Sequence, residues 1–448
     1  QKYGIDFFKK LRGFYSFCIF DNKNKSLILV RDKIGKKPLY YTHLNSEFIF
    51  SSEFNSLMSA IDKKQSINFD SISHYLWKGY YAHGATVYKN INTLLPGEII
   101  QYDIETNTTF KIKQEKFKLK INENYDERNI YDLKSSLLES IEYRFVSDVP
   151  VSMLLSGGVD SSLLALLAGD ELDKKFNTFY MGYDNSKDNY RDASTSISNI
   201  IKSNHKTLIM NQPEISSATE KMVSIFGEPF ADYSALPSYE LYKIVSNYSK
   251  VVIGGDGADE MFGGYNDIKI FSMFNVLLKM MPKIKVKDSL NTIFHLLNSN
   301  NKLIKSFGYF VAPALIDEQS LSSVTYNRGW NSLYRSEYMT EQGYRLTRKD
   351  NVERQESDIF RESGDHLIER FYNYYLVRLI YDFMVKVDRT SMANSLEVRL
   401  PYLDLFMLEN VNKIKPSNMA NMFQTKIELK NLLIAKGLNS ISKITKAG

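Results

Sequence analysis

The stretch that decides the fold runs from Val149 to Ser162 and reads VPVSMLLSGGVDSS. Its apolar first half predicts a buried strand, its two glycines predict a tight turn, and the leucines at 163–166 predict a helix. A helix N-terminus presents unpaired backbone N–H groups and the positive end of the helix dipole, and glycine lets an anion approach the main chain closely. The stretch therefore predicts a phosphate-binding loop between a strand and a helix.

The loop differs from the two commonest phosphate-binding patterns. It lacks the lysine of the P-loop and the G-x-G-x-x-G spacing of dinucleotide-binding folds. Instead it resembles the S-G-G-x-D-S-S pyrophosphate loop of the ATP pyrophosphatase superfamily, whose members cleave ATP between the α and β phosphates. Ser156, Ser161 and Ser162 would add hydroxyl donors, while Asp160 would cap the helix or hold Mg²⁺ beside the phosphates. The alternative is a purely structural serine-glycine turn.

The composition narrows the class of protein. With 448 residues, 43% of them hydrophobic, the chain is long enough for two domains. The net charge of +5 is modest and the lysines are scattered among acidic residues, so we expect neither nucleic acid nor membrane as a partner. A lone Cys18 permits no intrachain disulfide, and six scattered histidines lack the spacing of a zinc site, which fits the reducing cytoplasm. The apolar segment 271–281 is too short for a bilayer span and predicts an amphipathic helix.

The pattern of the chain changes near residue 125. Before it, short alternating runs predict antiparallel strands joined by turns, for example at 14–20, 26–30 and 47–51. The polar, lysine-rich region 107–124 predicts a connector. We therefore expect one domain at residues 1–124, including this connector, and a second at residues 125–448.

In the second domain, long helical patterns alternate with brief apolar strands, at 149–155, 177–181 and 250–253. This alternation is typical of a doubly wound, mainly parallel sheet. Such sheets bind ligands at the carboxyl ends of their strands. The phosphate loop is predicted at one of these ends.

A second loop follows the strand at 250–253 and reads GGDGADEMFGGY over residues 254–265. Asp256, Asp259 and Glu260 place three carboxylates within five positions, and their repulsion would be offset by a cation. Parallel strands end at one edge of a sheet, so both loops should leave the same edge. A solvated acidic loop is the alternative, but a neighbouring phosphate loop favours Mg²⁺ bridged to phosphates.

Further motifs in the same order resemble the asparagine synthetase family of the glutamine-hydrolysing type. The later half of that family's glutaminase domain is similar to residues 11–21, 30–41, 51–53 and 95–97. Its synthetase domain is similar to residues 228–232, 386–393 and 397–404. The resemblance implies an α+β remnant of an N-terminal-nucleophile glutaminase domain, followed by an α/β doubly wound parallel-sheet domain of the ATP pyrophosphatase (synthetase) type.

The resemblance also implies roles for individual residues. ATP and its pyrophosphate would bind at Leu155, Ser156, Gly157, Gly158, Asp160, Ser161, Ser162, Met181, Gly254 and Gly255. Mg²⁺ would bind at Asp160 and Asp259. Asp256 and Lys446 would be catalytic, and the charged residues Lys386, Asp388 and Arg389 would bind the substrate. Met181 is equally well an ordinary core residue, and Glu397 and Arg399 are equally well a packing ion pair.

The sequence departs from the family pattern at both ends. The N-terminal cysteine, whose sulfur and α-amine hydrolyse glutamine in the family, is absent. Cys18 lies in a strand-like apolar run, where a small buried hydrophobe is a better interpretation than a nucleophile. Residues 446–448 are similar to the start of the family's K-x-G-F segment, although Ile444 replaces its usual arginine. We therefore expect a fragment that is truncated at both ends.

The expected reaction is ATP-dependent amidation of aspartate to asparagine through an acyl-adenylate, with Mg²⁺ as cofactor and ammonia from glutamine hydrolysis. Two alternatives stay open: amidation of a sugar acid for a surface polysaccharide, and a nucleotide-binding regulatory module without turnover. The intact acidic motifs argue against the regulatory module. The expected partners are small molecules, and a homodimer is left open.

Overall fold

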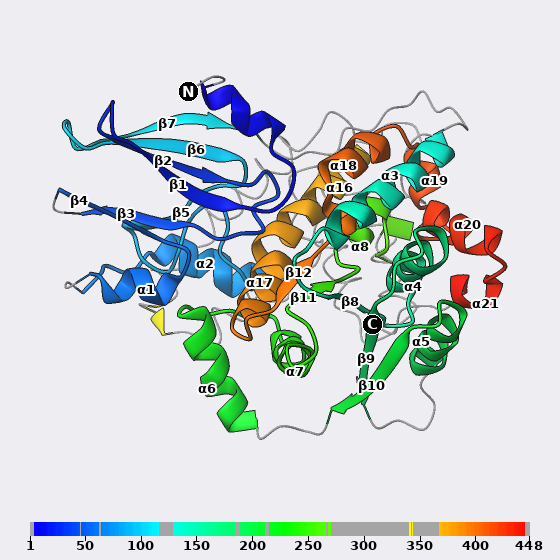
Figure 1. Cartoon of the computed structure of the whole chain (residues 1–448). Coiled ribbons are helices and arrows are strands. Elements are labelled where there is room, and N and C mark those ends of the chain that lie inside the picture. Colours follow the sequence, from blue (N-terminus) through cyan, green and yellow to red (C-terminus); the bar gives the residue numbers. More distant parts are fainter. Residues whose placement is uncertain are drawn as a thin grey trace, which may run out of the picture.

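The computed structural model describes most of the chain. The described residues are 4–44, 46–61, 64–115, 129–183, 189–210, 215–265, 268–269, 340–341, 343 and 367–443. Figure 1 shows two parts, a group of antiparallel strands in blue and cyan and a second, mainly green sheet flanked by helices. The two phosphate-site loops predicted from the sequence belong to the second part.

Two antiparallel sheets make up most of the N-terminal part. The first has the order β1–β2–β6–β7, with bounds Ser16–Asp21, Ser26–Arg31, Glu98–Asp103 and Thr108–Gln114. The second has the order β4–β3–β5, with bounds Glu47–Ser51, Tyr40–Leu44 and Ile91–Thr93. A 3₁₀ helix at Gly4–Lys10 and the helices α1 (Phe54–Ser59) and α2 (Phe69–Lys78) accompany them.

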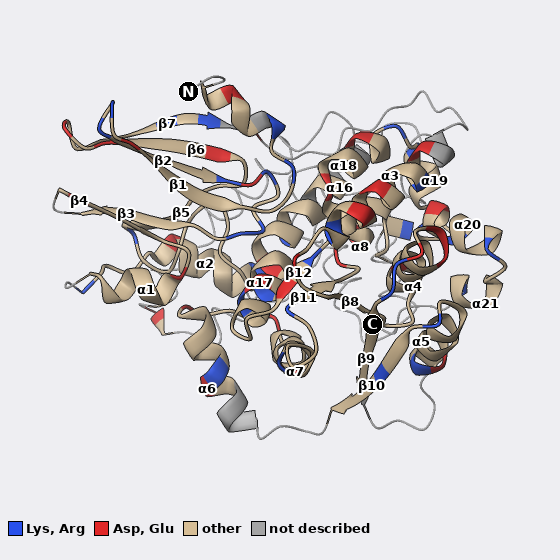
Figure 2. Cartoon of the chain, in the orientation of Figure 1, with Lys and Arg blue, Asp and Glu red and all other residues tan. Residues whose placement is uncertain are grey.

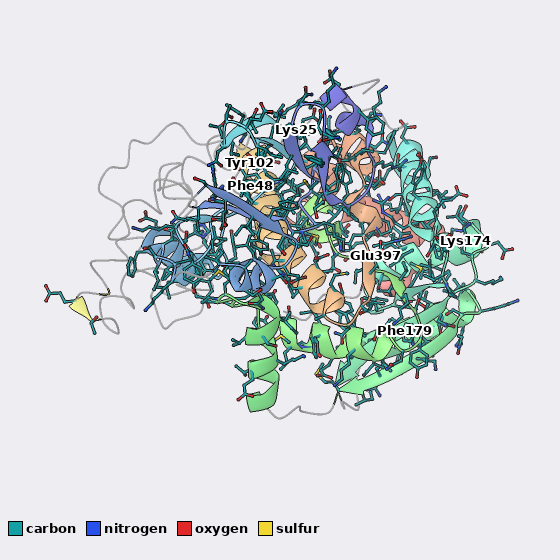
Figure 3. All side chains as sticks on the ribbon, turned by 60° about the vertical axis from the view of Figure 1, so that its left-hand side comes forward. Lys25, Phe48, Tyr102, Lys174, Phe179 and Glu397 are labelled. Atoms are coloured by element: carbon teal, nitrogen blue, oxygen red, sulfur yellow. The ribbon has the colours of Figure 1, made fainter. Side chains whose placement is uncertain are left out.

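The two sheets pack against each other. Leu29 of β2 and Ile100 of β6 share one buried cluster with Leu39 and Leu94, which adjoin β3 and β5. Phe48 of β4 also stacks on Tyr102 of β6, with ring centroids 4.4 Å apart (Figure 3). Alternating apolar residues on each strand thus supply one inner face, as the sequence pattern predicts.

The strands predicted at 14–20, 26–30 and 47–51 are confirmed as β1, β2 and β4. The connector predicted at 107–124 is wrong in its first half, because residues 108–114 form β7 and pair with β6. The main-chain groups of these residues are satisfied by pairing with β6 in this ladder. Cys18 lies in β1, half-buried, and burial raises the pKa of its thiol, so it is a poor nucleophile as predicted.

The second part is built on a five-stranded parallel sheet. Its order is β10–β9–β8–β11–β12, with bounds Asn204–Met210, Asn177–Tyr183, Val151–Leu154, Val251–Ile253 and Glu397–Arg399. The helices α4 (Val159–Leu166) and α5 (Asn189–Ile200) lie on one side of it, and α7 (Ala235–Val245) and α17 (Met384–Met392) on the other (Figure 1). This is the predicted parallel α/β architecture.

Further helices surround this core. Their bounds are α3 Asn129–Phe145, α6 Ile215–Phe226, α8 Ala258–Phe262, α16 Leu367–Arg378, α18 Leu405–Val411, α19 Pro416–Met419, α20 Ile427–Ala435 and α21 Asn439–Ser442. Among the described residues, no helix is long and apolar enough to cross a membrane. The amphipathic helix predicted at 271–281 and the predicted domain boundary at 124/125 lie outside the described residues.

The direction of winding reverses between β8 and β11. From β8 the chain passes through α4 to β9 and then β10 on one side, and it returns to β11 on the other side of β8. Open α/β sheets bind ligands at such a reversal, outside the carboxyl ends of the strands. Neither β10 nor β12 was predicted from the sequence, because β10 begins with three polar residues and is partly exposed, and the charged ends of β12 conceal a three-residue strand.

Candidate active site

The phosphate loop predicted from the sequence connects β8 to α4. Gly157 has φ +75°, and a Cβ there would lie 2.1 Å from the carbonyl oxygen of Tyr190, so only glycine fits. Gly158 precedes the first turn of α4 in an extended conformation, with no side chain capping the helix. The N–H groups of this first turn therefore remain available to an anion.

The serines of the loop fall into two groups. Ser161 Oγ accepts a hydrogen bond from the backbone N–H of Ser156 at 3.0 Å and lies 2.9 Å from Ser156 Oγ, so these two hydroxyls fix the shape of the loop. Ser162 is completely buried, and its hydroxyl has no hydrogen-bond partner in the part of the chain that the structure describes. A buried hydroxyl without a partner costs free energy, and a ligand oxygen would satisfy it.

The second predicted loop lies against the first. A Cβ on Gly255 would lie 3.3 Å from the Ser161 nitrogen and 3.4 Å from Asp160 Cβ. β8 and β11 are paired in parallel, so both loops leave the same edge of the sheet, as predicted. Gly257, with φ +94°, then turns the chain into α8.

Lys426 joins the acidic residues of the two loops, although no motif in the sequence marks it as part of the site. Its Nζ lies 2.5 Å from Asp160 Oδ2 and 2.6 Å from Asp259 Oδ1. Burial alone would lower the pKa of Lys426, but the two carboxylates outweigh burial and raise the pKa above that of a free lysine. The two residues predicted to hold Mg²⁺ therefore both contact one positive charge.

The three carboxylates of the second loop have different environments. Asp259 contacts Lys426, whereas buried Glu260 accepts a hydrogen bond from the Tyr265 hydroxyl. Asp256 is half-buried, and its carboxylate makes no hydrogen bond or ion pair with any described residue. Of the three, Asp256 is thus the carboxylate that is available to a reacting group.

The residues predicted near adenine lie around the same edge. Leu155 is completely buried in the core and donates its N–H to the Phe179 carbonyl, so any contact to adenine would involve its main chain. Met181 is half-buried on β9. Gly254 donates its N–H to the Arg399 carbonyl on β12. Lys446, predicted to be catalytic, lies outside the described residues.

The residues predicted to bind the substrate lie on α17, where the two parts of the chain meet. Asp388 Oδ1 contacts Lys36 Nζ at 3.3 Å and Lys37 Nζ at 2.8 Å. Burial opposes ionisation, but the two lysines hold the pKa of Asp388 below its ordinary value. These contacts give Asp388 a structural role between the two parts of the chain.

The other two residues of this group are also engaged. Arg389 forms an ion pair with Glu53 of the N-terminal part. Lys386 Nζ contacts Asp232 Oδ2 at 3.2 Å and Ser234 Oγ at 2.8 Å. The ion pair between Glu397 and Arg399 is present at 2.9 Å, which agrees with the packing interpretation. Figure 2 shows blue and red segments meeting around α17 and β12.

A cavity lies between the two parts of the chain. It encloses about 660 Å³ of empty space, part of it open to solvent, and is lined by Arg31, Tyr40, Tyr81, Glu228, Tyr381 and Arg389, among others. Glu228 is in the motif at 228–232, and its Oε2 accepts a hydrogen bond from the Val87 N–H at 3.2 Å. Burial raises the pKa of Glu228 to about 7.

A phosphate loop at the reversal of a parallel sheet, packed against an antiparallel two-sheet part, is the arrangement of a nucleotide-binding α/β domain joined to a second domain. The family model described as asparagine synthase matches residues 132–435, and the model described as glutamine amidotransferase domain matches residues 1–115. The chain belongs to the asparagine synthase family. The predicted family, and with it the class of glutamine-dependent carbon–nitrogen ligases, is thereby confirmed.

Two asparagine synthetases agree with this membership. A provisionally named glutamine-hydrolysing asparagine synthetase 2 of Methanocaldococcus jannaschii is 30% identical over 409 residues, covering 88% of this chain and 74% of that protein. The glutamine-hydrolysing asparagine synthetase 1 of Bacillus subtilis is 26% identical over 410 residues, covering 90% of this chain and 62% of that protein. The solved NH3-dependent NAD synthetase of Campylobacter jejuni aligns with 40% of this chain and 91% of its own, at 15% identity and a TM-score of 0.23.

Proposed function

We propose that this protein amidates aspartate to asparagine through an acyl-adenylate, consuming ATP and taking nitrogen from glutamine. The observation that carries the proposal is the pairing of two loops at the sheet reversal, where Ser156–Ser162 faces Asp259 across Lys426. Membership in the asparagine synthase family supports the reaction, and the relatives named above support aspartate as the acid.

The residues at this edge fit ATP together with Mg²⁺. Mg²⁺ is usually held by one or two carboxylates plus the phosphates of a substrate, and Asp160 and Asp259 supply that number. Among the described residues there is no group of three or more Asp, Glu, His or Cys that could hold a metal by itself. The unpartnered Ser162 hydroxyl adds a donor for a phosphate oxygen. Asp160 and Asp259 would hold Mg²⁺, which supplies charge neutralisation on the leaving pyrophosphate.

In the first half-reaction, a carboxylate oxygen of aspartate attacks the α-phosphorus of ATP. The bond from this oxygen to phosphorus forms, and the bond from the α-phosphorus to the bridging oxygen breaks, releasing pyrophosphate. The first turn of α4, with Gly157, Gly158 and the loop serines, would hold the pyrophosphate by main-chain and hydroxyl donors. No protein nucleophile is needed, because the substrate carboxylate itself attacks the α-phosphorus. Alignment of the reactants and neutralisation of charge accelerate this step.

In the second half-reaction, ammonia attacks the carbonyl carbon of the adenylate and AMP leaves. Attack creates an ammonium group that must lose a proton, and the carboxylate of Asp256 would accept it. Lys446 would stabilise negative charge on the phosphate or on the tetrahedral centre. Substrate binding by Lys386, Asp388 and Arg389, a cytoplasmic location and a homodimer stay predictions.

The reaction is tested with ATP, ammonium or glutamine, and a panel of acids that includes aspartate and several sugar acids. We expect AMP and pyrophosphate in ³¹P NMR, together with asparagine in the mass spectrum when aspartate is present. Release of ADP and inorganic phosphate as the primary products would contradict the adenylate mechanism. Amide formation from a sugar acid alone would support the adenylate mechanism and contradict aspartate as the substrate.

A further inference from the structure

Lys426 is built into its position between the two acidic loops. Its side chain is 9% exposed, and those of Asp160 and Asp259 are 20% and 12% exposed, so water screens the three charges little. Lys426 immediately precedes α20 and has φ +52°. This left-handed conformation turns the chain at Lys426 as it enters the helix. Its ammonium group lies where a cation shared by the two carboxylates would lie.

Gly264 shapes the space around this ammonium group. A Cβ at this position would lie 1.7 Å from Asp259 Oδ1 and 2.3 Å from Lys426 Cε. Neither distance is compatible with van der Waals contact. The second glycine of the pair at 263–264 is therefore needed for the contact between Lys426 and Asp259.

Other lysines add positive charge to this region. The pKa of Lys430, one turn further along α20, is lowered by its burial and by the charges of Lys269 and Lys426. Lys430 thus lies within electrostatic range of Lys269, Lys426 and Asp160. A bare divalent cation would have to displace a buried ammonium and approach two further positive charges.

A bound triphosphate changes this balance. Its oxygens can accept hydrogen bonds from the displaced ammonium group, and its negative charge offsets the two remaining lysines. Mg²⁺ also takes several of its ligands from substrate phosphates in sites with only one or two carboxylates. Nucleotide therefore supplies both a new partner for Lys426 and the ligands that the protein lacks.

We propose that Lys426 acts as a resident cation between Asp160 and Asp259, so that a divalent metal enters this site only together with ATP. The inference rests on the proposed function, because it takes these two carboxylates as the metal ligands. It assigns Lys426 a role in ordering the binding of metal and nucleotide. Lys426 is a positioning residue here, since it acts through the two carboxylates.

Equilibrium dialysis with Mn²⁺ tests the proposal without any turnover. The wild-type protein should retain little Mn²⁺ alone and should retain it in the presence of α,β-methylene-ATP, which cannot be cleaved between the α and β phosphates. The Lys426→Met variant should retain Mn²⁺ without nucleotide, at least about tenfold more tightly than wild type, because a buried positive charge has been removed. Methionine is unbranched like lysine, so it adds no new demand on the left-handed backbone.

The matched control is Lys436→Met, just beyond the last turn of α20. Lys436 pairs with Asp170 and Glu171 instead of the site carboxylates, so this variant should behave as wild type. The melting temperature provides a second readout: Mn²⁺ alone should raise it in Lys426→Met and leave it unchanged in wild type. The double variant Lys426→Met, Asp160→Asn should lose the gained Mn²⁺ binding.

Equal Mn²⁺ retention by wild type and Lys426→Met without nucleotide would overturn the proposal. This result is distinguishable from failure of the proposed function, which is judged by the products of ATP cleavage. A wild-type protein that makes AMP and pyrophosphate yet binds Mn²⁺ alone would keep the function and refute the role of Lys426. Nucleotide-dependent Mn²⁺ binding without pyrophosphate release would support the role of Lys426 and refute the proposed function.

Discussion

Lys37 and Asp388, 351 positions apart in the chain, form an ion pair with 2.8 Å between Nζ and Oδ1. Lys37 belongs to the N-terminal part, and Asp388 lies on α17 of the second part. The same helix contacts Glu53 through Arg389 and leads into β12, which pairs with β11 at the candidate active site. These contacts tie the N-terminal sheets to the strand that carries the acidic loop.

Replacing Asp388 tests how much this interface contributes to stability. In Asp388→Asn, the fully buried ammonium of Lys36 loses its carboxylate, and breaking such a buried pair costs about 3 kcal/mol or more. We expect a clear fall in the melting temperature. The control is Lys175→Ala, which removes an ion pair to Asp173 on the surface and should leave the melting temperature unchanged. Equal melting temperatures for both variants would show that the interdomain pair is not stabilising.

The shape of the phosphate loop is tested by Gly157→Ala. Gly157 and Gly437 have nearly the same positive φ, +75° and +77°, so alanine strains the backbone at either position by roughly 1–2 kcal/mol. Only at Gly157 would the new Cβ also meet a carbonyl oxygen at 2.1 Å. Gly157→Ala should therefore abolish pyrophosphate release, while Gly437→Ala should only lower the melting temperature modestly. Comparable activity in the two variants would contradict the steric argument.

The carboxylates that contact Lys426 are tested by Asp160→Asn and Asp259→Asn. Each change removes one charge that balances the cations around the phosphates, so pyrophosphate formation should fall by about two orders of magnitude or more. Cys18→Ala should leave it nearly unchanged, because Cys18 lies in β1 with a thiol pKa raised by burial. Near wild-type rates in either Asp variant would reduce that carboxylate to a structural role.

Glu228 predicts a pH dependence of stability. Its pKa is raised by burial to about 7 in the folded protein, whereas an unfolded Glu has a pKa near 4.5. Between these values the folded state binds the extra proton, so stability is highest below pH about 4.5 and falls as the pH rises through about 7, by at most about 3 kcal/mol for this group. Other groups titrate too, so the measurement is the difference in melting temperature between wild type and Glu228→Gln.

This difference should shift in favour of Glu228→Gln as the pH rises from 5 to 8, because glutamine cannot ionise. Glu105→Gln, at an exposed position in the turn after β6, serves as the control and should show no such trend. A flat difference for Glu228→Gln would mean that its carboxylate is ionised throughout this range.

The sequence predicted the local parts of the site well. The Ser156–Ser162 loop is one strand–turn–helix unit, so its residue types, periodicity and glycines all lie within one short window. The acidic loop after β11 was found for the same reason. Their approach to each other followed from the rule that parallel strands end at one edge.

Lys426 could not be found in this way. It lies 266 positions from Asp160, and nothing in its neighbourhood distinguishes it from the other 56 of the 57 lysines and arginines. The one signal in the sequence was that the clustered carboxylates need a cation beside them. This signal was interpreted as a site for Mg²⁺. The partners of Asp388 could not be found from the sequence either: its charge was noticed, but its lysine partners come from the distant N-terminal part.

The remaining prediction separates the two half-reactions at Asp256. Its half-buried carboxylate makes no ion pair with the described residues, unlike Asp259, which contacts Lys426. A carboxylate in this position is suited to accept a proton from ammonia, whereas adenylation depends on the phosphate loop and on Asp160 and Asp259. Loss of Asp256 should therefore affect amide formation more than pyrophosphate release.

In Asp256→Asn, aspartate and ATP should still give a burst of pyrophosphate, because alignment on the phosphate loop is intact. Asparagine should fall well below the pyrophosphate released, since asparagine at this position cannot accept the proton that ammonia must lose. Rapid-quench assays of both products across a range of ammonium concentrations measure this ratio, and Asp259→Asn, in which both products should fall together, is the matched control. A parallel loss of both products in Asp256→Asn would place Asp256 in the first half-reaction beside Asp259, and an unchanged ratio with full activity would remove it from the mechanism.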